Sequence, residues 1–162
     1  MRLIRTAAVA LTALVMTIPA AAHDRTPRRV QQSALSVSAQ SAAATVDAFH
    51  AALGRGDTGA AAALLADNAL IFEEGRVERT KAEYVAHHLA ADAAFSKVVS
   101  SAVARRAGGS NGPLAWIATE GRTTGAYKGR TIDQLTTETV ILRRAGATWK
   151  IVHIHWSSGA NH

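Results

Sequence analysis

The chain of 162 residues contains no cysteine and only 3 prolines, and aromatic side chains make up 5% of it. Without cysteine there can be no disulfide bond, so a stable fold must rely on a packed core. The apolar run Ala7–Ile18 is too short and too rich in alanine to be a convincing membrane span. About 120 residues with periodic apolar content suffice for one domain and leave no room for a second.

Residues 1–22 have the three parts of a secretory signal. A basic start with Arg2 and Arg5 precedes the apolar run, and the small residues 20–22 follow it. This order predicts cleavage before His23 and export to a bacterial periplasm or beyond. An uncleaved anchor is the alternative. After cleavage no stable membrane insertion is expected.

The positive charge of the chain is concentrated near the predicted new N-terminus. Without the two arginines of the signal, 16 Lys and Arg stand against 12 Asp and Glu, a net charge of +4. Arg25, Arg28 and Arg29 make the tail basic rather than the domain. Residues 23–40 are predicted to be a disordered, solvated lead-in, with adhesion to anionic lipid or nucleic acid as the alternative. No motif with interleaved aromatics favours a nucleic-acid partner.

Helical periodicity precedes strand alternation along the chain. A domain is predicted over residues 41–158, followed by a tail at 159–162. Asp57 is the expected N-cap of the second helix, and Thr80 with Glu83 forms a capping box for the third. The predicted helices are 41–53, 58–65 and 81–95, and the predicted strands are 69–72, 97–106, 114–122, 131–144 and 148–157. Helices followed by a meander indicate an α+β fold with an antiparallel sheet curled around helices.

Four segments carry a resemblance to a known family. They are the helix pair ending in Gly-Asp57, the turn Phe72-Glu-Glu-Gly, the His-His-Leu helix and the closing run Trp149-Lys-Ile-Val-His-Ile-His-Trp-Ser. Over about residues 44–158 the chain resembles the nuclear transport factor 2-like superfamily. Within it, the chain is similar to SnoaL-like proteins and to the association domain of calcium/calmodulin-dependent protein kinase II.

The resemblance implies a cone-shaped α+β barrel, also called cystatin-like, in which N-terminal helices pack in a curved antiparallel sheet. It further implies a pocket between the third helix and the sheet, and a homodimer formed through the outer face of the sheet. The superfamily includes isomerases, dehydratases, cyclases, binding proteins and assembly modules, so the fold alone does not settle the function.

His88 and Asp92 interrupt the apolar face of the predicted third helix. They lie four residues apart, in the middle of an apolar face formed by Tyr84, Val85, Leu89 and Phe95. We expect Asp92 to accept a hydrogen bond from one His88 nitrogen while the other nitrogen faces a cavity, as a general base requires. A histidine held in the core by its neighbour, without a ligand, is the alternative reading.

The kinase association domain has a pocket histidine at the place of His88. Its pocket arginines correspond to Ala118, Val140 and Trp156 here, so carboxylate binding by an arginine cluster is not expected. The same correspondence places two sets of side chains inside the cone. They are Trp116, Ala118 and Glu120 on one strand, and Val152, Ile154 and Trp156 on the last strand.

His153 and His155 alternate along the last predicted strand. If Ile154 and Trp156 point inward, both histidines lie on the outer face, beside a dimer interface. The opposite parity would bring both imidazoles inside, near His88, unless a bulge intervenes. A His-x-His pair can serve a metal site, but no metal-binding motif is present, so no metal or other cofactor is predicted.

Glu120 and Glu138 are acidic residues in the middle of predicted strands. An enclosed carboxylate with a raised pKa could act as a general base next to a carbonyl group. The alternative is a charge at the rim, paired with Arg122 or Arg144. Glu73 and Glu74 precede a glycine, and the simplest prediction is that they solvate a turn.

The resulting hypothesis is an exported homodimer that binds a small, largely apolar molecule in its cone. The alternatives are an acid/base enzyme of isomerase, dehydratase or cyclase type, with His88 as base and Asp92 as orienter, and a dimerisation or accessory module. The predicted pocket residues are Tyr84, His88, Asp92, Phe95, Trp116, Glu120, Val140 and Trp156, with His153 and His155 under the other parity.

Overall fold

Helices precede most of the strands in residues 35–161, the part of the chain that the computed structural model describes. A short 3-10 helix, η1 (Val37–Ala39), leads into four α-helices, and six strands form one sheet. The helices are α1 (Gln40–Arg55), α2 (Thr58–Leu64), α3 (Lys81–His87) and α4 (Leu89–Ser96). The strands are β1 (Leu65–Glu73), β2 (Arg76–Glu78), β3 (Val99–Asn111), β4 (Leu114–Tyr127), β5 (Arg130–Ala145) and β6 (Thr148–Ala160).

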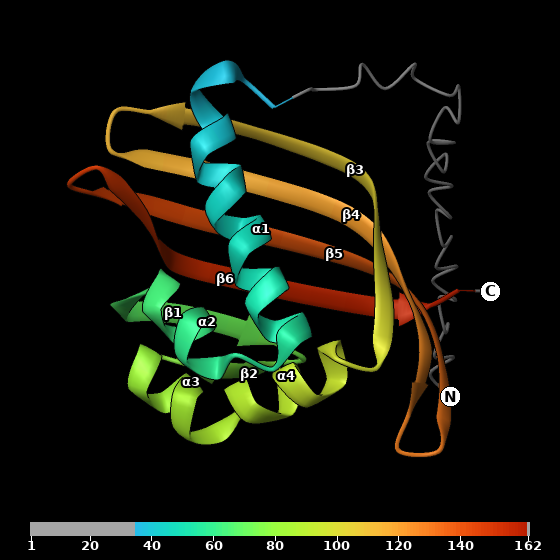
Figure 1. The fold of residues 1–162 in the computed structure, drawn as a ribbon. Coiled ribbons are helices and arrows are strands. Elements are labelled where there is room, and N and C mark those ends of the chain that lie inside the picture. Colours follow the sequence, from blue (N-terminus) through green and yellow to red (C-terminus); the bar gives the residue numbers. More distant parts are fainter. Residues whose placement is uncertain (1–34, 162) are drawn as a thin grey trace, which may run out of the picture. The chain divides into compact units, whose positions relative to one another are not determined.

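The sheet has the order β2-β1-β6-β5-β4-β3 and is strongly curved (Figure 1). All neighbouring strands are antiparallel except β1 and β6, which run parallel. Helix α1 lies across the concave face, while α2, α3 and α4 gather at one side of it (Figure 1). This arrangement confirms the predicted cone-shaped α+β architecture. No helix in the described part of the chain is long and apolar enough to cross a membrane.

Helix α1 is anchored by one apolar stripe, in which Val46, Phe49 and Leu53 are buried. It ends where Gly56 adopts a left-handed conformation with φ of 73°, a backbone geometry that residues with a Cβ rarely adopt. Asp57 caps α2, as predicted, and its Oδ1 accepts from the Ala60 amide at 2.9 Å. Local chemistry therefore determines how α1 turns into α2.

The prediction of one helix over 81–95 is wrong. The helix is interrupted at His88, whose φ of −118° departs from the usual helical value although its ψ stays at −32°. Neither Gly nor Pro lies nearby to explain the interruption. The His88 ring is instead bound to buried Glu78 of β2, so a tertiary contact separates α3 from α4. The Thr80 hydroxyl accepts from the Glu83 amide at 3.1 Å, but the Glu83 carboxylate bonds the Arg79 amide, so only half of the predicted capping box forms.

The folded region extends past both ends of the predicted domain. Ala39, placed by prediction in the disordered lead-in, is fully buried, and the Ser36 amide donates to the Gly108 carbonyl at 3.2 Å. At the other end β6 continues to Ala160, so part of the predicted tail belongs to the sheet. The predicted signal 1–22 lies outside the described residues.

A β-bulge in β6 resolves the two parities predicted for that strand. Ile141 pairs with His153 and Leu142 with Ile151, so Val152 is the extra residue. As a result, Trp149 and Ile151 before the bulge and Ile154 after it are all buried on the concave side. The inward placement predicted for Val152 is wrong, because this residue forms the bulge.

Candidate functional site

One row of side chains crosses the concave face of the sheet. Its members are register partners on five adjacent strands: Arg106 of β3, Thr119 of β4, Glu138 of β5, Trp156 of β6 and Glu73 of β1. Adjacent strands lie about 4.8 Å apart, so the row brings together residues from distant parts of the sequence. All five line the same cavity.

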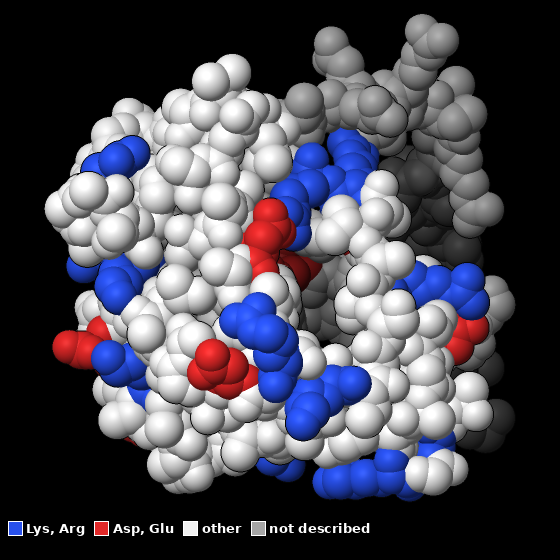
Figure 2. Space-filling view, viewed as in Figure 1, with Lys and Arg blue, Asp and Glu red and all other residues white. Residues whose placement is uncertain are grey.

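The cavity has a volume of about 700 Å³ and lies between this row and helices α1 and α4. It opens as a hollow in the face of the domain, with acidic side chains at its edge and Lys and Arg side chains around it (Figure 2). Phe95 of α4 contributes an aromatic wall and contacts the Tyr127 ring at 5.2 Å. A cavity of this size holds a drug-sized molecule.

Glu73 is the acidic group at the β1 end of the row. Burial, together with the negative charges of Asp92, Glu74 and Glu78, raises the pKa of Glu73 to about 7, although the nearby His88 opposes this rise. A carboxyl group poised near neutral pH can both take up and release a proton under physiological conditions.

Asp92 of α4 lines the same part of the cavity. The hydroxyl of fully buried Tyr84 donates to Asp92 Oδ2 at 2.7 Å. Burial raises the pKa of Asp92, even though the Tyr84 hydrogen bond and His88 favour its charged form. Tyr84 therefore fixes one oxygen of a carboxyl group that holds its proton more tightly than usual.

His88 is bound on both ring nitrogens. Nδ1 contacts the carboxylate of Glu78, and Nε2 lies 3.4 Å from Nη1 of Arg76. A guanidinium has no acceptor, so Nε2 accepts from Arg76 and Nδ1 donates to Glu78. The predicted hydrogen bond between His88 and Asp92 is wrong, because the break between α3 and α4 gives each residue another partner. His88 therefore offers no unoccupied nitrogen to a substrate.

His50 of α1 and Glu138 of β5 form a second carboxylate–imidazole pair. His50 Nε2 and Trp156 Nε1 both contact Glu138 Oε2, at 2.6 and 2.9 Å. Burial disfavours the charged carboxylate, but the hydrogen bond from His50, followed by the hydrogen bond from Trp156 and the charge of Arg106, outweighs it, so the pKa of Glu138 lies below its usual value. The Glu138 side chain is 10% exposed, whereas that of His50 is 42% exposed.

Four of the predicted pocket residues line the cavity: His88, Asp92, Phe95 and Trp156. Tyr84 and Val140 are buried in the core and reach the site only through their neighbours. Trp116 and Glu120 lie on the opposite face of the sheet, together with Ala118, so their predicted inward placement is wrong. Buried Ile117 pairs with buried Val140, and this register turns the even-numbered residues of β4 outward.

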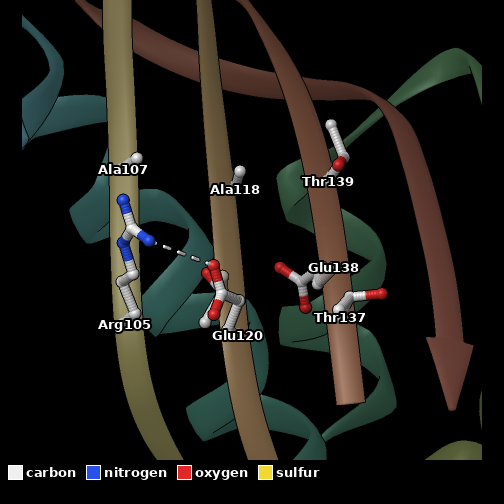
Figure 3. Close-up of a pocket in the computed structure, with 8 residues that line it drawn as sticks. Arg105, Ala107, Ala118, Glu120, Thr137, Glu138 and Thr139 are labelled. Carbon is white, nitrogen blue, oxygen red and sulfur yellow. Dashed lines mark ion pairs between the residues drawn. The ribbon is translucent and has the colours of Figure 1, made fainter. Parts of the chain in front are cut away.

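The outer face has a shallow depression of about 240 Å³ over β3, β4 and β5. Ala107 and Ala118 line its upper part, and Arg105 and Glu120 lie side by side below them (Figure 3). Arg105 Nη1 and Glu120 Oε1 are 3.8 Å apart, as expected for a loose surface ion pair. Trp116 covers Gly109 nearby and is 47% exposed.

His153 and His155 lie on the outer side of β6 around Phe72, with ring centroids 5.1 and 5.9 Å from it. His153 Nδ1 donates to the Leu70 carbonyl at 2.9 Å. Neither histidine lines the cavity. Within residues 35–161, no group of three or more His, Cys, Asp or Glu side chains is placed to hold a metal ion.

Sequence reasoning missed two groups at the cavity, Glu73 and His50. Glu73 was predicted to solvate a turn, and its inward direction follows from the alternation with buried Ala69 and Ile71 in β1. His50 carries no comparable signal in the sequence, because its partner Glu138 lies 88 residues later. The two arginines that were predicted to pair with Glu138 contact other residues instead. Arg122 pairs with Asp133, and Arg144 lies over the Trp149 ring.

Solved structures with the same architecture place the fold in the nuclear transport factor 2-like class. A candidate ketosteroid isomerase from Shewanella frigidimarina is 37% identical, with a TM-score of 0.72, over 76% of this chain and 100% of that one. A candidate dehydratase from Streptomyces avermitilis is 18% identical, with a TM-score of 0.66, over 76% of this chain and 98% of that one. A candidate calcium/calmodulin-dependent protein kinase II association domain from Xanthomonas campestris is 20% identical, with a TM-score of 0.65, over 81% of this chain and 96% of that one.

Residues 42–161 match the model of the SnoaL-like domain. The chain therefore belongs to the SnoaL-like family. The Streptomyces and Xanthomonas structures establish the fold alone, because their identity to this chain is low. No curated protein matches the chain.

Proposed function

We propose that the domain binds a small carbonyl compound in its cavity and moves a proton on it. The observation that carries this proposal is the meeting of Glu73 and Asp92 at one end of a 700 Å³ cavity, where Tyr84 fixes one oxygen of Asp92. A base and a hydrogen-bond donor for the same substrate are the two groups that proton abstraction next to a carbonyl needs.

In this proposal Glu73 is the base. Its carboxylate takes a proton from the carbon next to the carbonyl group, and the electron pair of the C–H bond moves toward the carbonyl oxygen. The charges of Glu73 and Asp92 interact, and burial favours the neutral form of Asp92. In this proposal the proton of the pair therefore lies on Asp92 while Glu73 is ionised, and Asp92 donates a hydrogen bond to that oxygen as its negative charge grows. If Glu73 exchanges that proton with solvent before the carbon is reprotonated, the result is isotope exchange at that carbon, and protonation of another carbon gives an isomer. The pKa of about 7 makes both directions accessible at neutral pH.

His88, the base expected from the sequence, has a different role in this proposal. Its two ring nitrogens are bound to Glu78 and Arg76, so it orders the β2 side of the cavity instead of touching the substrate. The 37% identity to a candidate ketosteroid isomerase supports a carbonyl substrate.

The test measures exchange of protons next to a carbonyl group. Wild type is incubated in D₂O with 6-methoxy-1-tetralone and smaller aryl ketones, and deuterium uptake is followed by mass spectrometry. Glu73→Gln should slow enzyme-dependent exchange at least about 100-fold, the usual contribution of a positioned base. Glu120→Gln is the matched control on the outer face and should exchange like wild type. If wild type binds the ketones but does not catalyse exchange, the proposed proton transfer is contradicted, and the domain is a binding protein.

We further propose that the mature protein works outside the cytoplasm. The support is the order of basic, apolar and small residues in positions 1–22. Intact-mass measurement of the protein from a periplasmic or culture fraction should give an N-terminus at His23. A full-length chain in the membrane fraction would instead favour an uncleaved anchor.

We also propose that two copies pair through the outer face of the sheet. Leu114 and Trp116 are exposed hydrophobic residues two positions apart on the outer face of β4, and exposed apolar side chains that lie together often mark interfaces. The printed description of the Xanthomonas neighbour as an association domain adds support. Light scattering should give a dimer, and Trp116→Glu should shift it toward monomer. A monomer at all concentrations would contradict this proposal.

A further inference from the structure

The cavity contains a polar group that the proposed proton transfer does not use. His50 projects from α1 toward the same row of residues, and its side chain is 42% exposed and lines the cavity. Nε2 is bound to Glu138 at 2.6 Å. No hydrogen bond joins Nδ1 to another residue of the described part, 35–161. One nitrogen of His50 is thus held by the protein, and the other is open to a ligand.

The bond to Glu138 determines what the open nitrogen can do. An ionised carboxylate only accepts hydrogen bonds, and the hydrogen bonds from His50 and Trp156 favour the ionised form of Glu138. The hydrogen on Nε2 therefore points to Glu138. In the neutral ring Nδ1 then carries a lone pair, so it accepts a hydrogen bond. A carboxylate behind an imidazole also fixes the ring orientation and stabilises a proton taken up at the other nitrogen.

The row of the sheet sets the separation between this group and Glu73. Glu138 pairs with Trp156, and Trp156 pairs with Glu73, so Glu138 and Glu73 lie two strand spacings apart, roughly 10 Å. The indole of Trp156 lies between them, next to the rings of Phe49 and Tyr84 at 6.3 and 6.4 Å. A flat apolar ligand across Trp156 would reach both polar groups.

We propose that His50, held by Glu138, is a second ligand-binding group that accepts a hydrogen bond from a hydroxyl of the bound molecule. This inference rests on the proposed function, and it narrows the substrate to a hydroxylated carbonyl compound. The carbonyl end lies at Asp92 and Glu73, the hydrocarbon ring lies over Trp156, and the hydroxyl lies at His50 Nδ1.

A second feature concerns the carboxylate that holds His50. The buried Oε1 of Glu138 has no hydrogen-bond partner among the described residues. Such a buried, unpartnered oxygen costs free energy. We attribute this cost to the role of the Glu138 carboxylate in orienting His50. An apolar side chain in its place would remove the acceptor of the His50 hydrogen bond, and the ring could then rotate.

The experiment compares pairs of ligands in which a methyl group replaces the hydrogen of one hydroxyl, so that the donor is lost. Dissociation constants of 6-hydroxy-1-tetralone and 6-methoxy-1-tetralone, and of 4-hydroxyacetophenone and 4-methoxyacetophenone, are measured from tryptophan fluorescence. Wild type should bind each hydroxyl compound about 10-fold more tightly, the scale of one hydrogen bond. His50→Phe should abolish the preference, Glu138→Gln should reduce it, and Glu120→Gln, on the outer face, should leave it unchanged.

The binding measurements distinguish a wrong role for His50 from a wrong proposed function. Equal affinity for both members of each pair in wild type, or a preference that survives His50→Phe, overturns the role of His50 while the carbonyl site stands. Absence of binding by every ketone overturns both. Asp92→Asn should weaken both members of a pair equally, because it changes only the carbonyl end.

A measurement without ligand gives a second check, which is independent of the folding of His50→Phe. The ¹⁵N chemical shifts of the neutral His50 ring should show the hydrogen on Nε2 and the lone pair on Nδ1. A neutral ring with its hydrogen on Nδ1 overturns the inference, because that nitrogen could not then accept from a hydroxyl.

Discussion

The two carboxylate–imidazole pairs of the cavity have the same chemical components but differ in what they leave open. In the Glu78–His88 pair both ring nitrogens are bound, the carboxylate is 6% exposed, and the imidazole is 26% exposed. In the Glu138–His50 pair one ring nitrogen is open, and the imidazole is 42% exposed. The first pair therefore holds β2 to the junction of α3 and α4, and the second presents a nitrogen to the cavity.

The difference shows that residue type does not identify a functional histidine. His88 has the features that sequence reasoning looks for, since it is a polar residue on an apolar helical face. The structure uses those features to bind Glu78 and Arg76. His50 lacks such a signal, and its importance depends on Glu138, a residue from the other end of the domain.

The largest effect is expected from Glu78→Ala. This change leaves the Nδ1 hydrogen of His88 without its buried acceptor and removes the contact that separates α3 from α4. It should lower the free energy of unfolding by about 3 kcal/mol, measured by urea unfolding. Glu78→Gln should cost only about 1 kcal/mol, because its amide oxygen can still accept from neutral His88. Equal losses for both variants would mean that the charge of Glu78, rather than its hydrogen bond to His88, holds this contact, and the contrast with the His50 pair would weaken.

The next largest effect is expected from Glu138→Gln. This change should lower the free energy of unfolding, measured by urea unfolding, by about 2 kcal/mol at pH 7. The pKa of Glu138 is lowered in the folded state, so its charged form contributes stability above the ordinary carboxyl range. That contribution is lost as pH falls through the folded-state pKa, below about 4.5. Wild type and variant should therefore converge once the pH is below that lowered folded-state pKa. A difference that persists there would come from packing instead of charge.

Glu73→Gln should change the free energy of unfolding with the opposite pH dependence, and by a smaller amount. The pKa of Glu73 is raised from 4.5 to about 7 by burial and by Asp92, Glu74 and Glu78, against the opposing effect of His88. The folded state therefore binds the proton more tightly, and wild-type stability should fall as pH rises from about 4.5 to about 7. Above pH 8 the variant should be more stable than wild type by about 1 to 2 kcal/mol, after allowance for solvent screening. Equal pH profiles would contradict the assignment of Glu73 as the poised base.

Local features of the fold were predictable from the sequence. Asp57 and Thr80 begin their helices as predicted, because a cap depends on residues three positions away. The break at His88 and the bulge at Val152 were not predictable, since each results from contacts with a distant strand. The faces of β4 were assigned wrongly because its register against β5 determines them.

The row across the sheet was also beyond prediction. It requires the parallel pairing of β1 with β6, which aligns Glu73 with Trp156. No local pattern in residues 65–73 specifies that neighbour. Trp156 could be named from the sequence because it closes a characteristic hairpin. The carboxylates on either side of it could not, because their positions depend on strand order.

The smallest effect is expected from Glu120→Gln, which provides the baseline for the carboxylates inside the cavity. Glu120 is 62% exposed and lies 3.8 Å from Arg105, so its loss should change the free energy of unfolding by less than about 0.5 kcal/mol. Urea unfolding at low protein concentration measures this value for the single chain. If two copies pair through the outer face, the effect should grow as protein concentration rises, because pairing removes Glu120 from water. A small effect at every concentration would locate the pairing surface elsewhere and leave the inner carboxylates as the ones that matter for stability.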